Sequence, residues 1–446
     1  MIRQNFNADW TVEKGDGNSR MNSFLGNTQT KTVHLPYDAM IHEARTPDTK
    51  NGAQTGFYPG GEYIFQKHFT APQAWQGKPV SLVFEGVYQT ALVYLNGWLL
   101  TRNVNGYAEF TVEAGPYLKY GADNLLKVIA DNSLEPNSRW YTGSGIYRPV
   151  RLLVGNKVYL PQDTVRITTR EADEGFALLD VTAQVQSAST VTERVTLQQT
   201  ICREGTAVLT DRQNLLLQPG ESRTVSFRYC VDSPALWSPE NPNLYTSTMQ
   251  VLEGEEELDR EETGFGIRTL SIDAAHGVRI NGQTVKLRGA CIHHDNGILG
   301  AATLPDAEER RIRQLKEAGF NAIRSSHHPA GRALLDACDR YGVLVMDELS
   351  DVWNVRKNPY DYALYFEQDW KPTIQKMVAK DYNHPSVILY CVGNEISEAG
   401  SESGAETNRR LCNTFRELDP TRYTTNALNG LMAAGYRLRE IMGDVM

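Results

Sequence analysis

Long apolar runs, basic clusters and paired cysteines are all missing from this sequence. No stretch approaches the roughly 18 apolar residues of a membrane span, and the first residues lack the apolar core of a signal peptide. The net charge is -9 and no long basic run is present, which argues against nucleic acid or an anionic membrane as a partner. The six cysteines form no CxxC pair, so neither a zinc finger nor a disulfide framework is indicated. These absences predict a cytoplasmic protein with reduced thiols and a neutral partner.

What the chain does contain is the length and composition of several globular domains. Its 446 residues exceed one ordinary domain, and typical domain sizes predict about three compact units. Hydrophobic residues make up 41% and charged residues 22%, proportions that fit a folded protein and exclude a disordered or fibrous one. Local patterns place the three predicted domains at residues 1–156, 157–267 and 268–446.

The first two predicted domains have the pattern of β-strands. Apolar runs at residues 91–95 and 98–100 flank Asn96-Gly97, a strong hairpin signal because both residues tolerate positive φ. Alternation with a period near two continues in the second domain, for example over residues 191–199 and 244–252. Each of these domains is therefore predicted to be an all-β sandwich.

After about residue 268, short apolar strands alternate with helical patterns. Strands are predicted over residues 286–290, 321–324, 343–346 and 387–392. The first helix is predicted to begin at Asp306, with Glu309 completing a capping box. Such alternation gives parallel strands joined by right-handed crossovers, and its repetition builds an eightfold (β/α)8 TIM barrel. About four units and the start of a fifth precede Met446, so we predict an incomplete barrel in a truncated chain.

Polar side chains follow each predicted strand, where the reactive groups of a parallel barrel lie. The clusters begin at His293, Arg324, Asp347 and Asn394. Two reactions suit such a rim: metal-assisted hydrolysis by histidines and carboxylates, and glycoside hydrolysis, which needs two carboxyl groups. Arg324 favours the second, because a guanidinium among the histidines would repel a divalent cation yet can hold a carboxylate or sugar hydroxyls.

Several long motifs make this interpretation specific. The sequence NHPSVILYCVGNE at residues 383–395 resembles the acid/base signature of glycoside hydrolase family 2, the β-galactosidase and β-glucuronidase family. Residues 321–348 resemble its second signature, and residues 144–148, 236–239 and 265–268 resemble motifs of its leading domains. The resemblance spans the chain. It implies a jelly-roll-like sugar-binding β-sandwich, an immunoglobulin-like β-sandwich and then the N-terminal part of a catalytic TIM barrel.

The resemblance also implies roles for individual residues. Glu395 would be the catalytic acid/base, and Asn394 would hydrogen-bond the sugar hydroxyl beside the anomeric carbon. His293 and His327 would hold substrate hydroxyls, and Arg324 would orient the nucleophile. Together they would cleave a terminal β-glycosidic bond with retention of configuration.

The family's nucleophile is a Glu near the end of barrel strand seven, which would lie beyond Met446. Glu348 is the nearest local substitute for this nucleophile. We prefer to interpret Glu348 as a supporting residue of the substrate site that forms a buried ion pair with an arginine. For His294 and His328, a structural role and a contact with substrate are equally expected. The resemblance thus implies a retaining exo-β-glycosidase of which these 446 residues alone are inactive.

The implied partner is a β-linked oligosaccharide or glycoside, with terminal β-D-galactosides first and β-D-glucuronides as the alternative. A non-catalytic carbohydrate-binding protein is the alternative of another class. The intact Asn394-Glu395 pair argues against it, because a binding module needs no general acid. A homo-oligomer is compatible with the family.

Two stretches depart from patterns seen in relatives. Several relatives hold magnesium through a carboxylate and a histidine after the third barrel strand, whereas residues 349–354 read LSDVWN here, so no metal and no cofactor is expected. Some relatives touch the sugar with an Asp in the loop that reads NSRWY at residues 137–141 here. That loop therefore does not identify the sugar.

Overall fold

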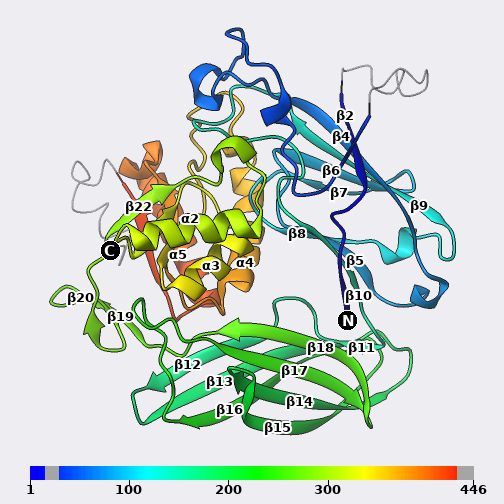
Figure 1. The fold of residues 1–446 in the computed structure, drawn as a ribbon, viewed down its shortest axis with the longest axis vertical. Coiled ribbons are helices and arrows are strands. Elements are labelled where there is room, and N and C mark those ends of the chain that lie inside the picture. Colours follow the sequence, from blue (N-terminus) through cyan, green and yellow to red (C-terminus); the bar gives the residue numbers. More distant parts are fainter. Residues whose placement is uncertain (16–29, 429–446) are drawn as a thin grey trace.

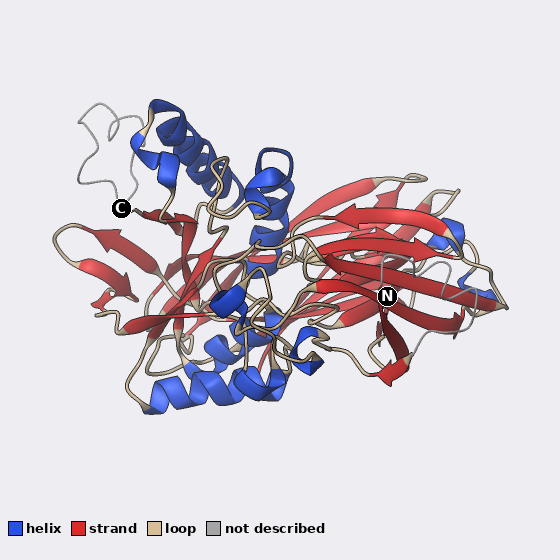
Figure 2. Cartoon of the chain, turned by 90° about the horizontal axis from the view of Figure 1, so that it is seen from above, coloured by secondary structure: helices blue, strands red, loops and turns tan. Residues whose placement is uncertain are grey.

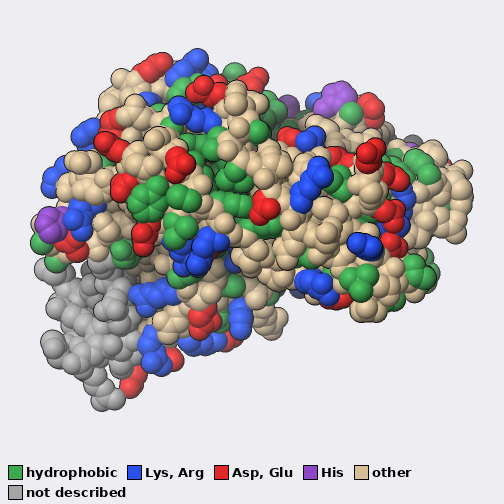
Figure 3. All heavy atoms as spheres, turned by 90° about the horizontal axis from the view of Figure 1, so that it is seen from below, with side chains coloured by type: hydrophobic (Ala, Val, Ile, Leu, Met, Phe, Trp, Pro, Cys, Tyr) green, Lys and Arg blue, Asp and Glu red, His purple; other side chains and the backbone are tan. Residues whose placement is uncertain are grey.

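The computed structural model describes residues 1–15 and 30–428, which form three units in contact with one another (Figure 1). The first two units consist mainly of strands, and the α-helices gather in the third (Figure 2). The predicted fold class, two β-sandwiches followed by an incomplete TIM barrel, is confirmed. No helix among the described residues is long and apolar enough to cross a membrane. Figure 3 shows one face of the molecule, on which acidic and basic side chains are interspersed.

The N-terminal sandwich consists of two antiparallel sheets. One has the strand order β1 (Ile2–Asn5), β10 (Val150–Val154), β5 (Val80–Phe84), β8 (Phe110–Glu113). The other has the order β3 (Lys31–Val33), β2 (Trp10–Lys14), β4 (Gly61–Thr70), β9 (Asp123–Asn132), β6 (Thr90–Leu95), β7 (Trp98–Asn103). The predicted hairpin at Asn96-Gly97 is confirmed, since it joins β6 to β7 with φ of 52° and 90°.

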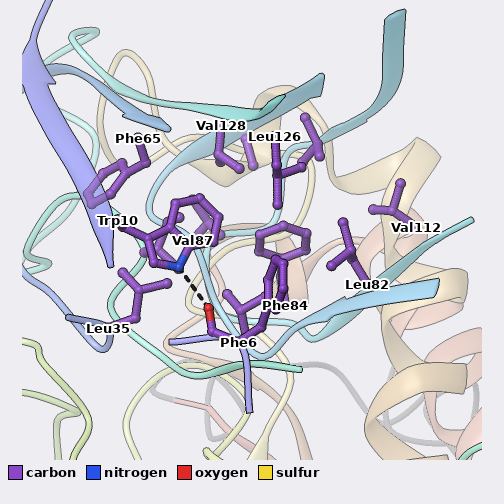
Figure 4. Close-up of a cluster of buried hydrophobic side chains, with 14 of the residues drawn as sticks. Phe6, Trp10, Leu35, Phe65, Leu82, Phe84, Val87, Val112, Leu126 and Val128 are labelled. Atoms are coloured by element: carbon purple, nitrogen blue, oxygen red, sulfur yellow. Dashed lines mark hydrogen bonds between the residues drawn. The ribbon is translucent and has the colours of Figure 1, made fainter. Parts of the chain in front are cut away.

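Side chains from both sheets of the N-terminal sandwich meet in one apolar core (Figure 4). Trp10 is fully buried there, and its indole N–H donates to the carbonyl oxygen of Phe6 at 2.8 Å. Phe84 stacks on Phe110 with ring centroids 5.0 Å apart. The alternation of buried and partly exposed residues along β9 explains why one face of the strand enters this core.

The second sandwich also has two antiparallel sheets. The first contains β11 (Val158–Tyr159), β13 (Phe176–Ser187), β12 (Arg166–Ala172) and β16 (Ser222–Asp232). The second has the order β15 (Thr206–Leu217), β14 (Glu193–Arg203), β17 (Tyr245–Glu253), β18 (Glu256–Phe265). Apolar side chains of both sheets form its core.

The third unit is part of a parallel barrel. Its strands pair in the order β22 (Gly289–Ile292), β23 (Ala322–Ser325), β24 (Leu344–Glu348), β25 (Val387–Asn394), β26 (Tyr423–Ala427). The helices between them are α2 (Pro305–Glu317), α3 (Arg332–Tyr341), α4 (Phe366–Asp381) and α5 (Glu402–Leu418). All eight residues of β25 are buried, as expected for a strand covered on both faces. Within the described residues the sheet has five of the eight strands of a closed barrel.

Two local predictions for this unit are wrong. Helix α2 begins at Pro305 rather than being capped by Asp306, because proline fits the first helical position and its missing N–H costs nothing there. The first barrel strand is β22, not residues 286–290. The Asn321 side chain accepts from Arg288 N and donates to Lys286 O, and so replaces strand pairing over that stretch.

A small sheet that the sequence reasoning missed precedes the barrel. It contains β19 (Leu270–Asp273), β20 (Gly277–Ile280) and β21 (Gln283–Thr284). Its Ile280 packs in a cluster with Trp237 of the second sandwich and with Leu344 and Ile388, near the amino ends of β24 and β25. The sheet therefore covers the end of the barrel opposite the strand ends that carry polar side chains.

All three units meet at Arg332, the first residue of α3. Its guanidinium donates to both carboxylate oxygens of Glu109 in the N-terminal sandwich, at 2.8 and 2.9 Å, and pairs with Asp163 of the second sandwich at 2.5 Å. Burial alone would raise the pKa of Glu109, but the charge and hydrogen bonds of Arg332 outweigh it and lower the pKa to about 2. This paired charge joins the two sandwiches to the barrel.

Replacing Arg332 with Met should strongly destabilise the protein, because two poorly exposed carboxylates lose the guanidinium that they share. We expect the free energy of unfolding to fall by about 3–5 kcal/mol, measured by urea denaturation. Arg340→Met is the matched control, since the Arg340 pair with Glu309 is 49% and 39% exposed and should contribute less than about 1 kcal/mol. Equal losses of unfolding free energy in the two variants would contradict the conclusion that Arg332 stabilises the contact among the three units.

Candidate active site

The predicted site residues meet at the carboxyl ends of neighbouring strands. Glu348 is the last residue of β24 and is fully buried. It accepts a hydrogen bond from Arg324 Nε at 2.6 Å, and its other oxygen lies 2.6 Å from His327 Nδ1. The expected buried ion pair between Glu348 and an arginine is confirmed. This carboxylate thereby joins the ends of β23 and β24.

Arg324 extends the network to the end of β25. Its Nη2 atom donates to Asn394 Oδ1 at 2.9 Å. The amide nitrogen of Asn394 donates to Asp351 Oδ1 at 2.8 Å, so cation and carboxylate together fix which way the amide points. Asn394 Nδ2 carries two hydrogens and Asp351 takes one, which leaves a donor hydrogen for a ligand hydroxyl.

Glu395 differs from its buried neighbours. Its side chain is 45% exposed, and its Oε2 atom lies 3.6 Å from Arg139 Nη1. Its backbone has a φ of 46°, a left-handed conformation that is uncommon outside glycine, and its N–H donates to Ala427 O at 2.7 Å. Strained backbone of this kind costs about 1–3 kcal/mol and persists only where the surroundings impose it. The carboxyl group is thus partly exposed and faces Arg139 of the N-terminal sandwich.

Asp351 supplies a further carboxylate of the site, besides those of Glu348 and Glu395. It receives hydrogen bonds from Arg139, Asn394 and Lys357, the last at 2.9 Å. Burial alone would raise the pKa of Asp351, but the hydrogen bonds from Arg139 and Asn394 and the charge of Lys357 outweigh it and lower the pKa. Asp351 is therefore held in its ionised form and acts as an acceptor.

Two aromatic side chains of the N-terminal sandwich cover the histidines. Trp140 stacks on His293 with ring centroids 5.1 Å apart and meets His327 edge-on at 5.5 Å. Tyr107 stacks on His328 at 4.0 Å. Burial lowers the pKa of His293, whose Nδ1 lies 2.7 Å from the carbonyl oxygen of Ser326. His293 is thus kept neutral, with Nδ1 donating to that carbonyl and Nε2 as an acceptor.

His294 and His328 lie deeper than their neighbours. They are 6% and 3% exposed, and His294 Nε2 donates to the carbonyl oxygen of Thr142 at 2.9 Å. Burial lowers the pKa of His294 to about 3 and that of His328 well below its usual value. Their packing against the N-terminal sandwich favours the structural interpretation.

Among residues 1–15 and 30–428, one group of side chains could hold a metal ion, and it lies at the other end of the barrel. Asp336, Asp339 and His384 offer ligand atoms within 4.8 Å of one another. His384 precedes β25, so the group is near the amino ends of the strands. His384 Nδ1 is already 2.5 Å from Asp339 Oδ2, an ion pair that raises the pKa of the imidazole despite its burial. This ion pair connects α3 to the turn before β25.

Sequence reasoning missed five residues of this arrangement: Tyr107, Arg139, Trp140, Asp351 and Lys357. Asp351 follows Glu348 by three residues, a spacing that could have suggested a second strand-end carboxylate. Arg139 and Trp140 stand in a loop rich in Asn and Ser with no strand or helix pattern. Some relatives touch the sugar from this loop, but only the packing of the two units shows that Arg139 and Trp140 of this chain reach the barrel.

A parallel barrel segment behind two β-sandwiches, with an Asn-Glu pair, an arginine and histidines at the strand ends, defines a multidomain barrel protein with a polar site at its strand ends. Three family models match in succession: the Glycosyl hydrolase 2 galactose-binding domain-like model at residues 10–176, Glycosyl hydrolases family 2 at 158–268, and the Glycosyl hydrolases family 2 TIM barrel domain at 274–439. The chain belongs to glycosyl hydrolase family 2, as the motifs indicated.

Relatives with different names share this architecture. The chain is 37% identical over 406 residues to a β-galactosidase of Bacteroides ovatus, covering 91% of this chain and 48% of that protein. It is 27% identical to a β-glucuronidase of Bacteroides fragilis, covering 90% of this chain and 58% of the relative. A solved family 2 structure from Bacteroides cellulosilyticus superposes with a TM-score of 0.94 at 35% identity, covering 99% of this chain and 58% of the other. The chain thus spans about half the length of these proteins.

Low pH should destabilise the protein through His294. Below pH 6.5 the unfolded chain binds a proton at this imidazole, whereas the folded protein, with a pKa of about 3, does not. The free energy of unfolding should therefore fall by about 1.4 kcal/mol per pH unit between pH 6.5 and 3 from this group. Denaturation of wild type and His294→Gln at pH 7.5 and 5 checks this: the variant should lose less stability than wild type between the two pH values. Identical losses would show that the imidazole titrates alike in both states.

Proposed function

We propose that the protein represented by this chain is a retaining exo-β-glycosidase that removes terminal sugars from β-linked oligosaccharides or glycosides. The observation that carries the proposal is the pair Asn394-Glu395 at the end of β25. The amide is fixed between a cation and a carboxylate, and the next carboxyl group is partly exposed beside Arg139. A rigid hydrogen-bond donor beside a partly exposed carboxyl group would supply a substrate contact and one of the two carboxyl groups that glycoside cleavage requires.

In the proposed reaction Glu395 donates its proton to the glycosidic oxygen as the bond from that oxygen to the anomeric carbon breaks. A second carboxylate, which we place outside residues 1–446, attacks the anomeric carbon and forms a glycosyl ester. Glu395, now ionised, then takes a proton from water, and the water oxygen displaces the ester, so that the sugar keeps its configuration. Asn394 would donate to the hydroxyl next to the anomeric carbon, a bond that strengthens in the transition state.

His293, His327, Arg324 and Glu348 are proposed to shape the substrate site. Glu348 is buried and paired with the partly buried Arg324, so their part is to hold Asn394 in place. His293 and His327 are both partly exposed, and their exposed edges can meet sugar hydroxyls.

β-D-Galactosides are the first proposed substrate, supported by the relative at 37% identity that is named a β-galactosidase. β-D-Glucuronides are the second, supported by the relative named a β-glucuronidase and by a solved β-glucuronidase of Bacteroides uniformis with a TM-score of 0.84 at 27% identity. The two sugars differ in the group at carbon 6, which is a carboxylate in the glucuronide, and in the configuration at carbon 4, so an assay with both distinguishes the candidates directly.

The test is to express the full product of the coding sequence and assay aryl β-galactoside and aryl β-glucuronide. Glu395→Gln should lower kcat by about 100- to 10,000-fold, because amide replaces the proton donor. Glu417→Gln, an exposed carboxylate on α5, is the matched control and should retain activity. Turnover by residues 1–446 alone would contradict a nucleophile outside them. Sugar binding without hydrolysis by the full product would instead favour a carbohydrate-binding protein.

A further inference from the structure

The loop between β9 and β10 of the N-terminal sandwich brings Arg139 to the barrel. Arg139 Nε and Nη2 donate to the two carboxylate oxygens of Asp351 at 3.0 and 2.6 Å. The side chain of Asp351 is only 10% exposed. Two parallel charge-assisted hydrogen bonds fix orientation as well as position, which a single contact would not do.

Asp351 passes this constraint to Asn394. One Asp351 oxygen, Oδ1, accepts from Arg139, from Lys357 at 2.9 Å and from the Asn394 amide at 2.8 Å. Lys357 also donates to the backbone carbonyl oxygen of Asn394 at 2.7 Å. The side chain of Asn394 is thus held by Asp351, which Arg139 orients, and its backbone carbonyl is held by Lys357, which donates to the same carboxylate.

The same guanidinium also faces Glu395. Its third nitrogen, Nη1, lies 3.6 Å from Glu395 Oε2, while the other two hold Asp351. Arg139 is therefore placed to orient two consecutive residues of the proposed site, one through Asp351 and one directly. In both contacts the orienting group comes from the N-terminal sandwich, and the residue that it orients comes from the barrel.

We infer that Arg139 is a positioning residue of the glycosidase site, supplied by the N-terminal sandwich, which aligns the Asn394 amide through Asp351 and the Glu395 carboxyl group directly. The inference rests on the proposed function. It implies that the N-terminal sandwich completes the site and does more than anchor the barrel.

The alternative is a purely structural role, in which Arg139 only stabilises the contact between the N-terminal sandwich and the barrel. Arg102 offers a matched comparison, because it also reaches from the N-terminal sandwich to the barrel, where it contacts Tyr365 through a hydrogen bond of 3.4 Å and lies over its ring. Loss of a purely structural contact would lower activity on all substrates by the same factor. A residue that aligns Asn394 should affect substrates according to whether they carry the hydroxyl that this amide binds.

The test measures kcat/KM of the full-length enzyme on a 4-nitrophenyl β-glycoside and on its 2-deoxy analogue. Arg139→Gln should lower kcat/KM on the parent substrate by about 100-fold, as a displaced catalytic group does. The preference for the parent over the 2-deoxy substrate should fall by about tenfold or more, because the transition-state bond to the hydroxyl is lost. Arg139→Lys should fall between wild type and Arg139→Gln, since lysine keeps the charge without the two-pronged contact.

Arg102→Gln should leave the preference for the hydroxyl unchanged. An unchanged preference in Arg139→Gln, whether or not its activity falls, would overturn the inference and leave Arg139 with a purely structural role. An inactive wild-type enzyme on both sugars would overturn the proposed function and this inference together. An active wild type with an unaffected Arg139→Gln variant would overturn the inference alone.

Discussion

The buried carboxylate of Glu348 sets the constraint on which the strand ends depend. A charge without access to water must be paired, and here Arg324 from β23 and His327 from the following turn supply the pairing. Arg324 has a further donor, which reaches Asn394 on β25. One electrostatic requirement therefore holds three neighbouring strand ends in register and presents Asn394 with its orientation already fixed.

The same physical requirement joins the units of the molecule. Arg332 pairs with carboxylates of both sandwiches, and Arg139 crosses from the N-terminal sandwich to Asp351. Arginine suits both places because its planar fork can satisfy two oxygens at once and stays charged when partly buried. The barrel contributes the strands, whereas side chains of the N-terminal sandwich, Trp140 among them, form part of the wall around the strand ends.

Much of the fold could be predicted because local patterns carry it. The alternation that buries one face of β9, the Asn96-Gly97 turn and the strand-helix repeat after the second sandwich each depend on neighbours in sequence. Predictions failed where a distant or special residue intervened. The Asn321 side chain displaced the start of the first barrel strand, and Pro305 moved the start of α2.

The sequence by itself determined the family, the fold class and the strand-end positions of Glu395, Asn394 and Glu348, since motif and periodicity are properties of a contiguous segment. Tertiary structure alone decided that Arg139 and Asp351, 212 residues apart, share two hydrogen bonds. It also decided which histidines are sealed from water. Burial and pairing between separate units are set by how their surfaces pack. No local sequence pattern encodes contacts between residues so far apart in the chain.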